Sequence, residues 1–381
     1  MTMVYSEEQR QLADTAREFL AAKSPVSALR RLRDEKPAAG FDAALWQQFA
    51  DMRWTAIPFP EALGGLEFGC KGLGPVFEES GRTLCASPML SSVVLAGTVL
   101  QFAGSAEQQE RLLPDLISGS KRLALAIDER PRHDPASIGL RAELDGDDYR
   151  LSGEKCFVID GVDADSWIVV GRLPDGQVAL FVVEAGSEGL SVVPTPLIDS
   201  HNHARLRLIE VRVSASNRLL QGNVAAALDL ALDRARACLA AEMLGASQIA
   251  FDTTVEYLKT RVQFDAPIGS FQALQHRAAW CYVHLALARS AVMGALSALD
   301  DDKTSAAERS RMVSLAKWKA GEVAQRVSNE AIQMHGGIGV TDELDIGLYM
   351  KRIRVAQACL GDADFLVASY DKSSVLQAHA G

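Results

Sequence analysis

The sequence predicts a mainly α-helical protein with a β domain in its middle. Residues 1–118 carry apolar side chains at helical spacing, and residues 221–381 do so again. Between them, residues 119–220 contain short runs rich in β-branched and aromatic residues, separated by Gly and Asp turns. We therefore expect three domains with these boundaries. The length of 381 residues agrees, because one hydrophobic core rarely serves so long a chain.

The N-terminal domain is predicted to contain two helices that begin with a capping box. Ser6 and Gln9 have the required spacing, and Ser105 and Gln108 repeat it near the end of the domain. Between these two helices, apolar residues at helical spacing predict helices in FDAALWQQFADM, GLGPVFEESGRTL and SSVVLAGTVLQFAG. The stretch FPEALGG is expected to be a loop.

The middle domain is predicted to be a sheet that ends near Ser216. Its expected strands are LALAIDER, YRLSGEKCFVID, SWIVVGR, VALFVVEA, LSVVPTPL and RLRLIEVRVS. Turns such as DGDD and LPDG separate these runs.

The C-terminal domain is predicted to be a bundle of long helices. The first covers residues 223–264, and a later one runs from about Thr304 to Met334 and stops at Gly336-Gly337, where Gly can take a helix-ending left-handed conformation. This glycine pair is either an ordinary helix cap or a place where a phosphate group comes close. A second helical piece follows, then a break at Gly361 and a last helix. Apolar residues on several helix faces suggest that the bundle also buries a partner chain.

Composition excludes several classes of protein. The net charge of −10 argues against a nucleic-acid surface and a basic membrane patch. The six Cys are scattered, without CxxC, and the seven His form no HExxH, so no metal site is expected and the thiols indicate a reducing compartment. No apolar run has the length of a membrane span, so we expect a cytoplasmic protein without a membrane partner.

Three stretches carry a resemblance to a known family. RVQFDAPIGSFQALQH, from Arg261 to His276, resembles the RxxFGxPIxxFQxxQ signature of the acyl-CoA dehydrogenase family. QMHGGIG, from Gln333, resembles its QxxGGxG, and GEKCFV, from Gly153, resembles its GxKxWIT strand. The resemblance covers essentially the whole chain. It implies an N-terminal helical domain, a middle β-barrel domain and a C-terminal four-helix bundle.

The resemblance also implies a reaction and a cofactor. Members of the family use FAD to oxidise an acyl-CoA thioester to a 2-enoyl-CoA, in fatty acid or steroid catabolism. A base removes the α-proton, the β-hydride goes to flavin N5, and an electron-transfer flavoprotein takes the electrons. An α-proton beside a thioester is weakly acidic, so the base is a carboxylate in a dry site, where its pKa rises.

Residues expected at the adenine and pyrophosphate end of FAD match the family well. In the family two subunits share each FAD, and this end is held by the neighbouring subunit. Arg261 would then supply a fixed cation to the pyrophosphate, with a surface ion pair as its alternative role. The other expected cofactor contacts are Phe264, Gln272, Gln333, Gly336 and Gly337.

Residues expected at the flavin ring match less well. Phe157 and Val158 keep the apolar stacking wall, but Ile159 stands where the family has a hydroxyl-bearing Thr. In the ring-contacting loop, AxTEPxAGSD in the family, Glu129 and the pair Ala136-Ser137 are recognisable.

The catalytic base is the largest departure from the family pattern. Most members have a Glu immediately before the glycine that matches Gly361, and here this position is Leu360. Some branches place the base on the first bundle helix, and here that position is Ala235. The carboxylates nearby in the sequence are Asp362, Asp364 and Asp233, which are the candidates for a displaced base. Asp233 and Arg236 match a pair that lines the acyl-CoA channel in relatives.

We therefore expect an acyl-CoA dehydrogenase subunit, and three hypotheses remain. The leading one is a non-catalytic subunit that completes the FAD site of a related, base-bearing subunit in a heteromer. The second is a homo-oligomer, dimer or tetramer, with a displaced Asp base. The third is a non-redox binding protein on the same fold.

Overall fold

The computed structural model describes residues 5–37 and 39–378, and side chains as far as residue 372. It divides into two compact units. Unit 1 comprises residues 1–29, 70–85 and 236–381, and unit 2 comprises residues 30–69 and 86–235. The expected boundaries of three domains stay a prediction.

Both predicted capping boxes of the first 118 residues are present. Ser6 Oγ accepts from the Gln9 N–H at 3.3 Å and Gln9 Oε1 accepts from the Ser6 N–H at 2.9 Å, and Ser105 with Gln108 repeats this arrangement. The expected loop FPEALGG contains one short 3₁₀ turn, and SSVVLAGTVLQFAG begins within a π-helix. The helices are α1 (Glu7–Lys23), α2 (Val26–Glu35), α3 (Ala43–Asp51), α4 (Gly69–Thr83), π-helical η3 (Met89–Ala96), α5 (Gly97–Ala103) and α6 (Ala106–Ile117).

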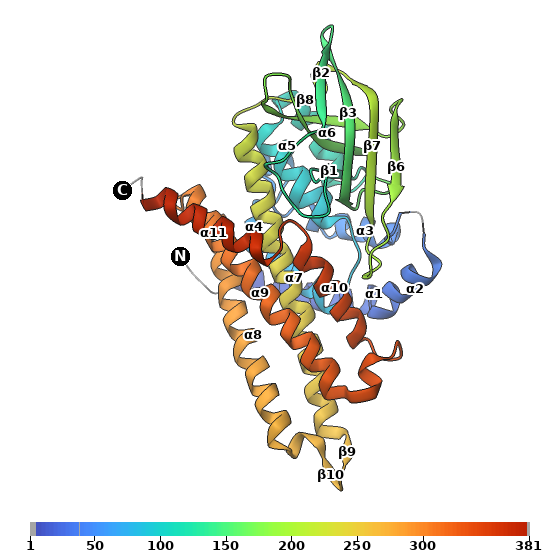
Figure 1. Ribbon diagram of the computed structural model, residues 1–381, viewed down its shortest axis with the longest axis vertical. Coiled ribbons are helices and arrows are strands. Elements are labelled where there is room, and N and C mark those ends of the chain that lie inside the picture. The colour runs from blue at the N-terminus through green and yellow to red at the C-terminus, as the bar shows by residue number, and fades with distance from the viewer. Residues whose placement is uncertain (1–4, 38, 379–381) are drawn as a thin grey trace. The chain divides into compact units, whose positions relative to one another are not determined.

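Unit 2 contains an eight-stranded mixed sheet (Figure 1). Its strands are β1 (Leu123–Ala126), β2 (Arg141–Asp145), β3 (Asp148–Ile159), β4 (Ser166–Arg172), β5 (Val178–Glu184), β6 (Leu190–Pro194), β7 (His203–Val213) and β8 (Arg218–Leu219). The order is β6-β7-β3-β2-β4-β5-β8, and β1 pairs with β4 in parallel. The hydrophobic core is built by inward-facing residues such as Leu151, Phe181 and Leu206. Strand β2 was not predicted, because RAELD is short and has no β-branched or aromatic residue, although its polar and apolar residues alternate.

Unit 1 contains the long helices of the chain (Figure 1). They are α7 (Val224–Thr260), α8 (Gln272–Leu299), α9 (Ala306–His335), α10 (Ile346–Ala358) and α11 (Ala363–Ala378). Helix α9 packs against α8, α10 and α11, so it is the centre of the bundle. The first residues of α7, from Val224 to Ala235, belong to unit 2. The predicted stops at Gly336 and Gly361 are confirmed.

One helix, α8, is long and apolar enough to pass a composition test for a membrane span. A core helix of a soluble bundle passes the same test, and α8 packs along α9. The fold class predicted from the sequence is confirmed.

Candidate functional site

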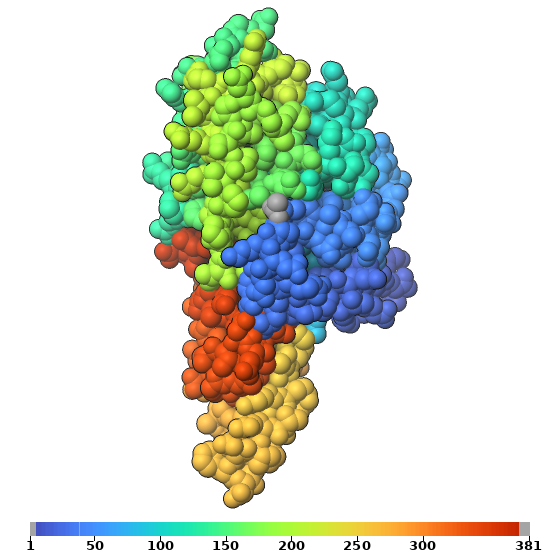
Figure 2. All heavy atoms as spheres, turned by 90° about the vertical axis from the view of Figure 1, so that its right-hand side faces the viewer, coloured from blue at the N-terminus to red at the C-terminus, as the bar shows by residue number. Residues whose placement is uncertain are grey.

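The end of α7 leads into a short hairpin that carries the predicted pyrophosphate residue. Strands β9 (Val262–Gln263) and β10 (Ala266–Pro267) pair, and the Ile268 N–H donates to the Arg261 carbonyl oxygen at 2.8 Å. The hairpin is the exposed yellow-orange end of unit 1 in Figure 2. The exposed Arg261 guanidinium makes no hydrogen bond or ion pair within the described part of the chain. A surface ion pair therefore does not account for this residue.

Two aromatic side chains flank the start of α8. Phe264 is 89% exposed at the hairpin turn and meets Phe271 edge to face, with ring centroids 6.2 Å apart. Gln272, the first residue of α8, is exposed, and its amide bonds to no other described residue. Such an exposed Phe costs solvation free energy unless something covers it, so the hairpin has the character of a contact surface.

The end of α9 forms the second half of this edge. Helix α9 ends at His335, and Gly336 has φ 66° and ψ −140°. The positive φ was predicted, but this ψ lies far from the left-handed helical region that was expected. A Cβ on Gly336 or on Gly337 would meet no atom within 4 Å, so both glycines border open space. Gln333 is exposed one turn earlier, and its amide has no described partner.

A ring contact joins the two halves of the edge. The His335 ring lies 4.4 Å from the Tyr257 ring, and Nδ1 of His335 is 2.8 Å from the Ala331 carbonyl oxygen. Tyr257 lies one helical turn before Arg261 on α7, so the contact holds the hairpin near the glycine pair. Together they offer a cation, two amides and unobstructed backbone, which fits the phosphate and adenosine groups of a dinucleotide. We call residues 261–272 and 333–337 the dinucleotide edge.

The turn after α10 contains Leu360, where the sequence comparison with the family motif predicts the position of the base. Helix α10 ends at Ala358, and Leu360 follows with φ 56° and Gly361 with φ 115°. A left-handed conformation costs a side-chain-bearing residue about 1–2 kcal/mol, so contacts must hold it there. Leu360 is 4% exposed.

Two cations hold the carbonyl oxygens of this turn. Arg236 Nε donates to the Leu360 carbonyl oxygen at 2.8 Å, and its guanidinium lies 5.1 Å from the centre of the Phe365 ring. Lys317 Nζ donates to the carbonyl oxygens of Gly361, at 2.6 Å, and Gln357, at 3.1 Å. Within the part of the chain that is described, Lys317 has no carboxylate in ion-pair range. These contacts were not predicted.

Burial sets the protonation of Lys317. Its side chain is fully buried, which lowers the pKa of the amine from 10.5 to about 7. The positive charge of Arg236 also lowers this pKa, while Cys359 and Asp362 raise it. The sequence contained a sign that Lys317 is buried, because Val313, Ala316 and Ala320 lie beside it on the apolar face of α9.

Of the two predicted displaced bases, Asp362 is half-buried and Asp364 is exposed. Asp362 Oδ1 accepts the Phe365 N–H at 2.9 Å, and its carbonyl oxygen accepts the Leu366 N–H at 3.0 Å, so this residue caps α11. Asp364 is exposed in the first turn of α11. Earlier on α7, Asp233 is 6% exposed and Ala235 is fully buried. No carboxylate replaces the side chain at position 360 in the turn itself.

The predicted ring-side residues lie in unit 2. Phe157 has φ 51° in an irregular stretch of β3, where the register with β7 shifts between Lys155 and Val158. Such bulges re-aim side chains. Phe157 is half-buried, whereas Val158 lies in the hydrophobic core, so Phe157 is the side chain available for a flavin contact.

The loop after β1 is held by a charged pair that was not predicted. Lys155, fully buried, donates from Nζ to Glu129 Oε1 at 2.7 Å, and Glu129 also accepts the N–H groups of Gly139 and Leu140. Burial lowers the pKa of Lys155. Burial alone would raise the pKa of Glu129, but the hydrogen bonds from Lys155 and Leu140 outweigh it and hold this pKa below its usual value. The pair fixes the loop 129–140 although its sequence departs from the family pattern.

Within the described residues, no group of three or more His, Cys, Asp or Glu side chains could hold a metal ion. The candidate site comprises the dinucleotide edge and the turn 357–361.

Most of the chain is similar to known proteins. Residues 6–120 match the family described as acyl-CoA dehydrogenase, N-terminal domain, and residues 224–370 match acyl-CoA dehydrogenase, C-terminal domain. Acyl-CoA dehydrogenase FadE27 of Mycobacterium tuberculosis is 31% identical over 327 residues, which cover 85% of this chain and 86% of the relative.

Two solved structures have the same fold. A variant of the Tcur3481–Tcur3483 steroid ACAD is 32% identical, with a TM-score of 0.87 over 98% of this chain and 99% of that one. The ChsE4–ChsE5 complex from M. tuberculosis is 28% identical, with a TM-score of 0.87 and the same coverage of 98% and 99%. The chain belongs to the acyl-CoA dehydrogenase family.

Proposed function

We propose that this chain is the non-catalytic subunit of a heteromeric acyl-CoA dehydrogenase and completes the FAD site of a related, base-bearing subunit. The proposal rests on one observation: Leu360 is buried in a turn whose carbonyl oxygen accepts from Arg236, at the position where we expect the family's base. A leucine side chain has no group that can take the α-proton of a thioester. The similarity to the ChsE4–ChsE5 complex supports a partner of related sequence.

The dinucleotide edge gives this chain its role toward the cofactor. FAD, the cofactor of the family, accepts a hydride when it is bound. Arg261 would hold the pyrophosphate, and it loses no ion pair in doing so. The amides of Gln272 and Gln333 would bond the adenosine part. Gly336 and Gly337 leave room for it because a Cβ at either position would point into open space.

The acyl-CoA thioester is the proposed substrate of the assembly, and an electron-transfer flavoprotein is its proposed electron acceptor. Asp233 and Arg236 lie three residues apart on α7 and are proposed contacts of the acyl-CoA channel. Both are nearly buried, at 6% and 5% exposure, as expected of channel residues rather than of solvated charges. The exposed aromatic residues of the hairpin support an oligomer, either a dimer or a tetramer. The proposed location of this oligomer is the cytoplasm.

Reconstitution tests this function. The chain is purified alone and together with a related subunit that carries the Glu, and flavin content and oxidation of an acyl-CoA are measured. The proposal predicts little flavin and no oxidation for the chain alone, and both for the pair. Full flavin occupancy with acyl-CoA oxidation by the lone chain would overturn it.

The alternative with a displaced base is tested in the same preparation. Asp362→Asn and Asp364→Asn are compared for bleaching of the flavin by substrate. Loss of bleaching in one variant alone would favour this alternative, and unchanged bleaching in both would remove it. The third hypothesis, a binding protein without FAD, fails if the purified assembly shows a flavin absorbance band.

A further inference from the structure

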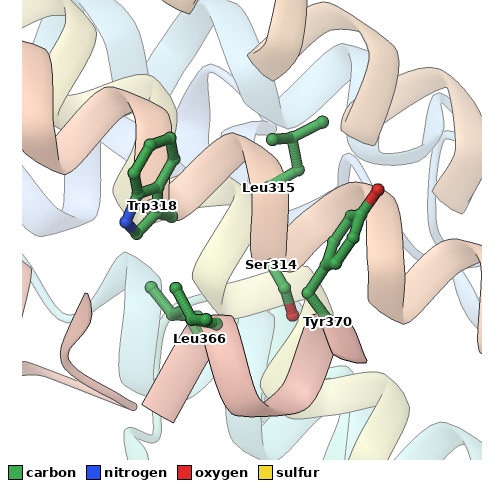
Figure 3. Close-up of a pocket in the computed structure, with 6 residues that line it drawn as sticks. Ser314, Leu315, Trp318, Leu366 and Tyr370 are labelled. Atoms are coloured by element: carbon green, nitrogen blue, oxygen red, sulfur yellow. The ribbon is translucent and has the colours of Figure 1, made fainter. Parts of the chain in front are cut away.

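The turn between α10 and α11 is buried, and side chains from two other helices hold its main chain. A hollow of about 160 Å³ separates α9 from α11 beside the start of α11. In Figure 3, Ser314, Leu315 and Trp318 of α9 face Leu366 and Tyr370 of α11 across it. The hollow lies beside the first turns of α11, where Leu366 is nevertheless buried.

Hydrogen bonds from two side chains hold the carbonyl oxygens of the turn. The carbonyl oxygens of Gln357, Leu360 and Gly361 accept from Lys317 or Arg236, which approach from two different helices, α9 and α7. The last carbonyls of a helix carry partial negative charge and have no partner inside the helix. The two cations therefore satisfy groups that would otherwise be buried without partners, and these bonds are charge-assisted when the donor is protonated.

The backbone at the turn needs this support. Leu360 has φ 56° and Gly361 has φ 115°, both unfavourable for an ordinary residue. A Cβ on Gly361 would lie 2.4 Å from Cδ1 of Phe365, so the glycine also lets α11 start close to the turn. Asp362 caps α11 through the Phe365 N–H at 2.9 Å, which fixes the far side of the turn.

We propose that Lys317 and Arg236 are positioning residues: they hold the turn 357–361 by its carbonyl oxygens, and so give the side chain at position 360 one fixed direction, whichever residue stands there. The turn thus keeps the geometry for a base although this chain has lost the base. The inference rests on the proposed function, because the direction of the side chain at position 360 has a catalytic role only in an acyl-CoA dehydrogenase. Its first test needs neither cofactor nor partner.

The first test is amide hydrogen exchange of residues 358–363 in the purified chain. Lys317→Met removes the donor and keeps the apolar length of the side chain. Loss of the two hydrogen bonds from Lys317 should speed local exchange by about 10- to 100-fold while distant helices keep their rates. Lys319→Met is the matched control: it removes the same charge from the same helix, but Lys319 Nζ bonds Glu322 at 2.7 Å and does not reach the turn.

Arg236→Met is the second variant. It is needed because Lys317→Met replaces a fully buried side chain, and such a chain can fail to fold. Arg236→Met removes the bond to Leu360 from the other side and should also speed exchange at residues 358–363. Rates at the turn that stay at the wild-type value in a folded Lys317→Met or Arg236→Met chain would overturn the inference. So would a uniform increase along the whole chain, which indicates a merely structural role.

The second test restores a carboxylate at the turn with Leu360→Glu. Exchange of the acyl-CoA α-proton with deuterated water is measured together with acyl-CoA affinity. The inference predicts exchange by Leu360→Glu, and a rate about 10-fold or more lower after Lys317→Met is added, with unchanged affinity. A variant that binds acyl-CoA without any exchange would contradict a fixed direction toward the substrate. Failure to bind acyl-CoA would instead contradict the proposed function, and the first test would still decide the inference.

Discussion

Lys317 Nζ lies 2.6 Å from the carbonyl oxygen of Gly361, 44 residues further along the chain. An ammonium this deeply buried usually has a carboxylate partner, because burial of a charge is costly. Here main-chain oxygens take that place. The contact joins α9 to the turn that contains Leu360, the position at which we predict that the family carries its base.

Lys317 should make stability depend on pH. Its pKa is about 7 in the folded chain and 10.5 in the reference state, so between these values the unfolded chain binds the proton and the folded chain does not. The free energy of unfolding must then rise with pH in this window, by up to about 1.4 kcal/mol per pH unit. Below about pH 7 both states hold the proton, and this contribution to the slope disappears.

Urea unfolding of the wild type and of Lys317→Met at pH 7.5 and pH 9.5 checks this prediction. When the free energy of unfolding of Lys317→Met is subtracted from that of the wild type, the contributions of the other titrating groups cancel. This difference should shift in favour of the wild type by ~2 kcal/mol between the two pH values. A difference that does not change with pH would contradict the buried, proton-releasing amine.

Arg261→Ala should weaken FAD binding by the assembled heteromer without loss of stability. The guanidinium has no described partner to lose, so unfolding free energy should change by less than about 0.5 kcal/mol. Loss of charge-assisted phosphate contacts should weaken FAD binding by roughly 10- to 100-fold. Flavin fluorescence titration measures it. Lys259→Ala is the control, because Lys259 is exposed near the same helix end and bonds Glu256 at 2.7 Å. Equal FAD affinity of both variants would contradict the role of Arg261.

Gly336→Ala and Gly337→Ala should distinguish the cost of backbone strain from the loss of room for the cofactor. Gly336 has φ 66° and ψ −140°, so an alanine there should cost about 1–3 kcal/mol of stability. Gly337 has no positive φ and no atom within 4 Å of a Cβ, so Gly337→Ala should melt like the wild type but bind FAD more weakly in the heteromer. Thermal melting and flavin content measure the two effects. Unchanged flavin content of Gly337→Ala would show that no ligand comes close there.

The pair Lys155–Glu129 should be strongly coupled. Lys155 is fully buried, so Glu129→Gln or Lys155→Met should each destabilise the chain by about 3–5 kcal/mol, and the double variant by less than the sum. The folded pKa of Glu129 lies below 4.5, so its stabilisation is present above that pH and is lost as pH falls through the folded value. Denaturant unfolding of a double-mutant cycle measures this. Glu154→Gln, on the same strand but exposed, is the control; additive losses would contradict the coupling.

Local chemistry allowed much of the fold to be predicted. The capping boxes at Ser6 and Ser105 depend on residues three apart, and the stop of α9 depends on a glycine that can take a positive φ. Strand β2 was missed because its register with β3, not its own composition, makes it a strand.

In the candidate site too, residues within short motifs could be proposed from the sequence, whereas contacts between distant segments could not. The dinucleotide edge lies in two short motifs, so the sequence shows it directly. The contacts of Lys317 and Arg236 join residues from three helices, and a lysine in a helix resembles a surface residue until its neighbours are known. The pair Lys155–Glu129 escaped prediction in the same way, since 26 residues separate its members.

The most direct test of the account is whether this chain can remove the α-proton of an acyl-CoA thioester. The purified chain is incubated with an acyl-CoA in deuterated water, with and without FAD, and deuterium at the α-carbon is followed by NMR. The account predicts no exchange above the buffer rate for the lone chain, and exchange once the base-bearing partner is added. Enzyme-dependent exchange by the lone chain would contradict the claim that it lacks a catalytic base.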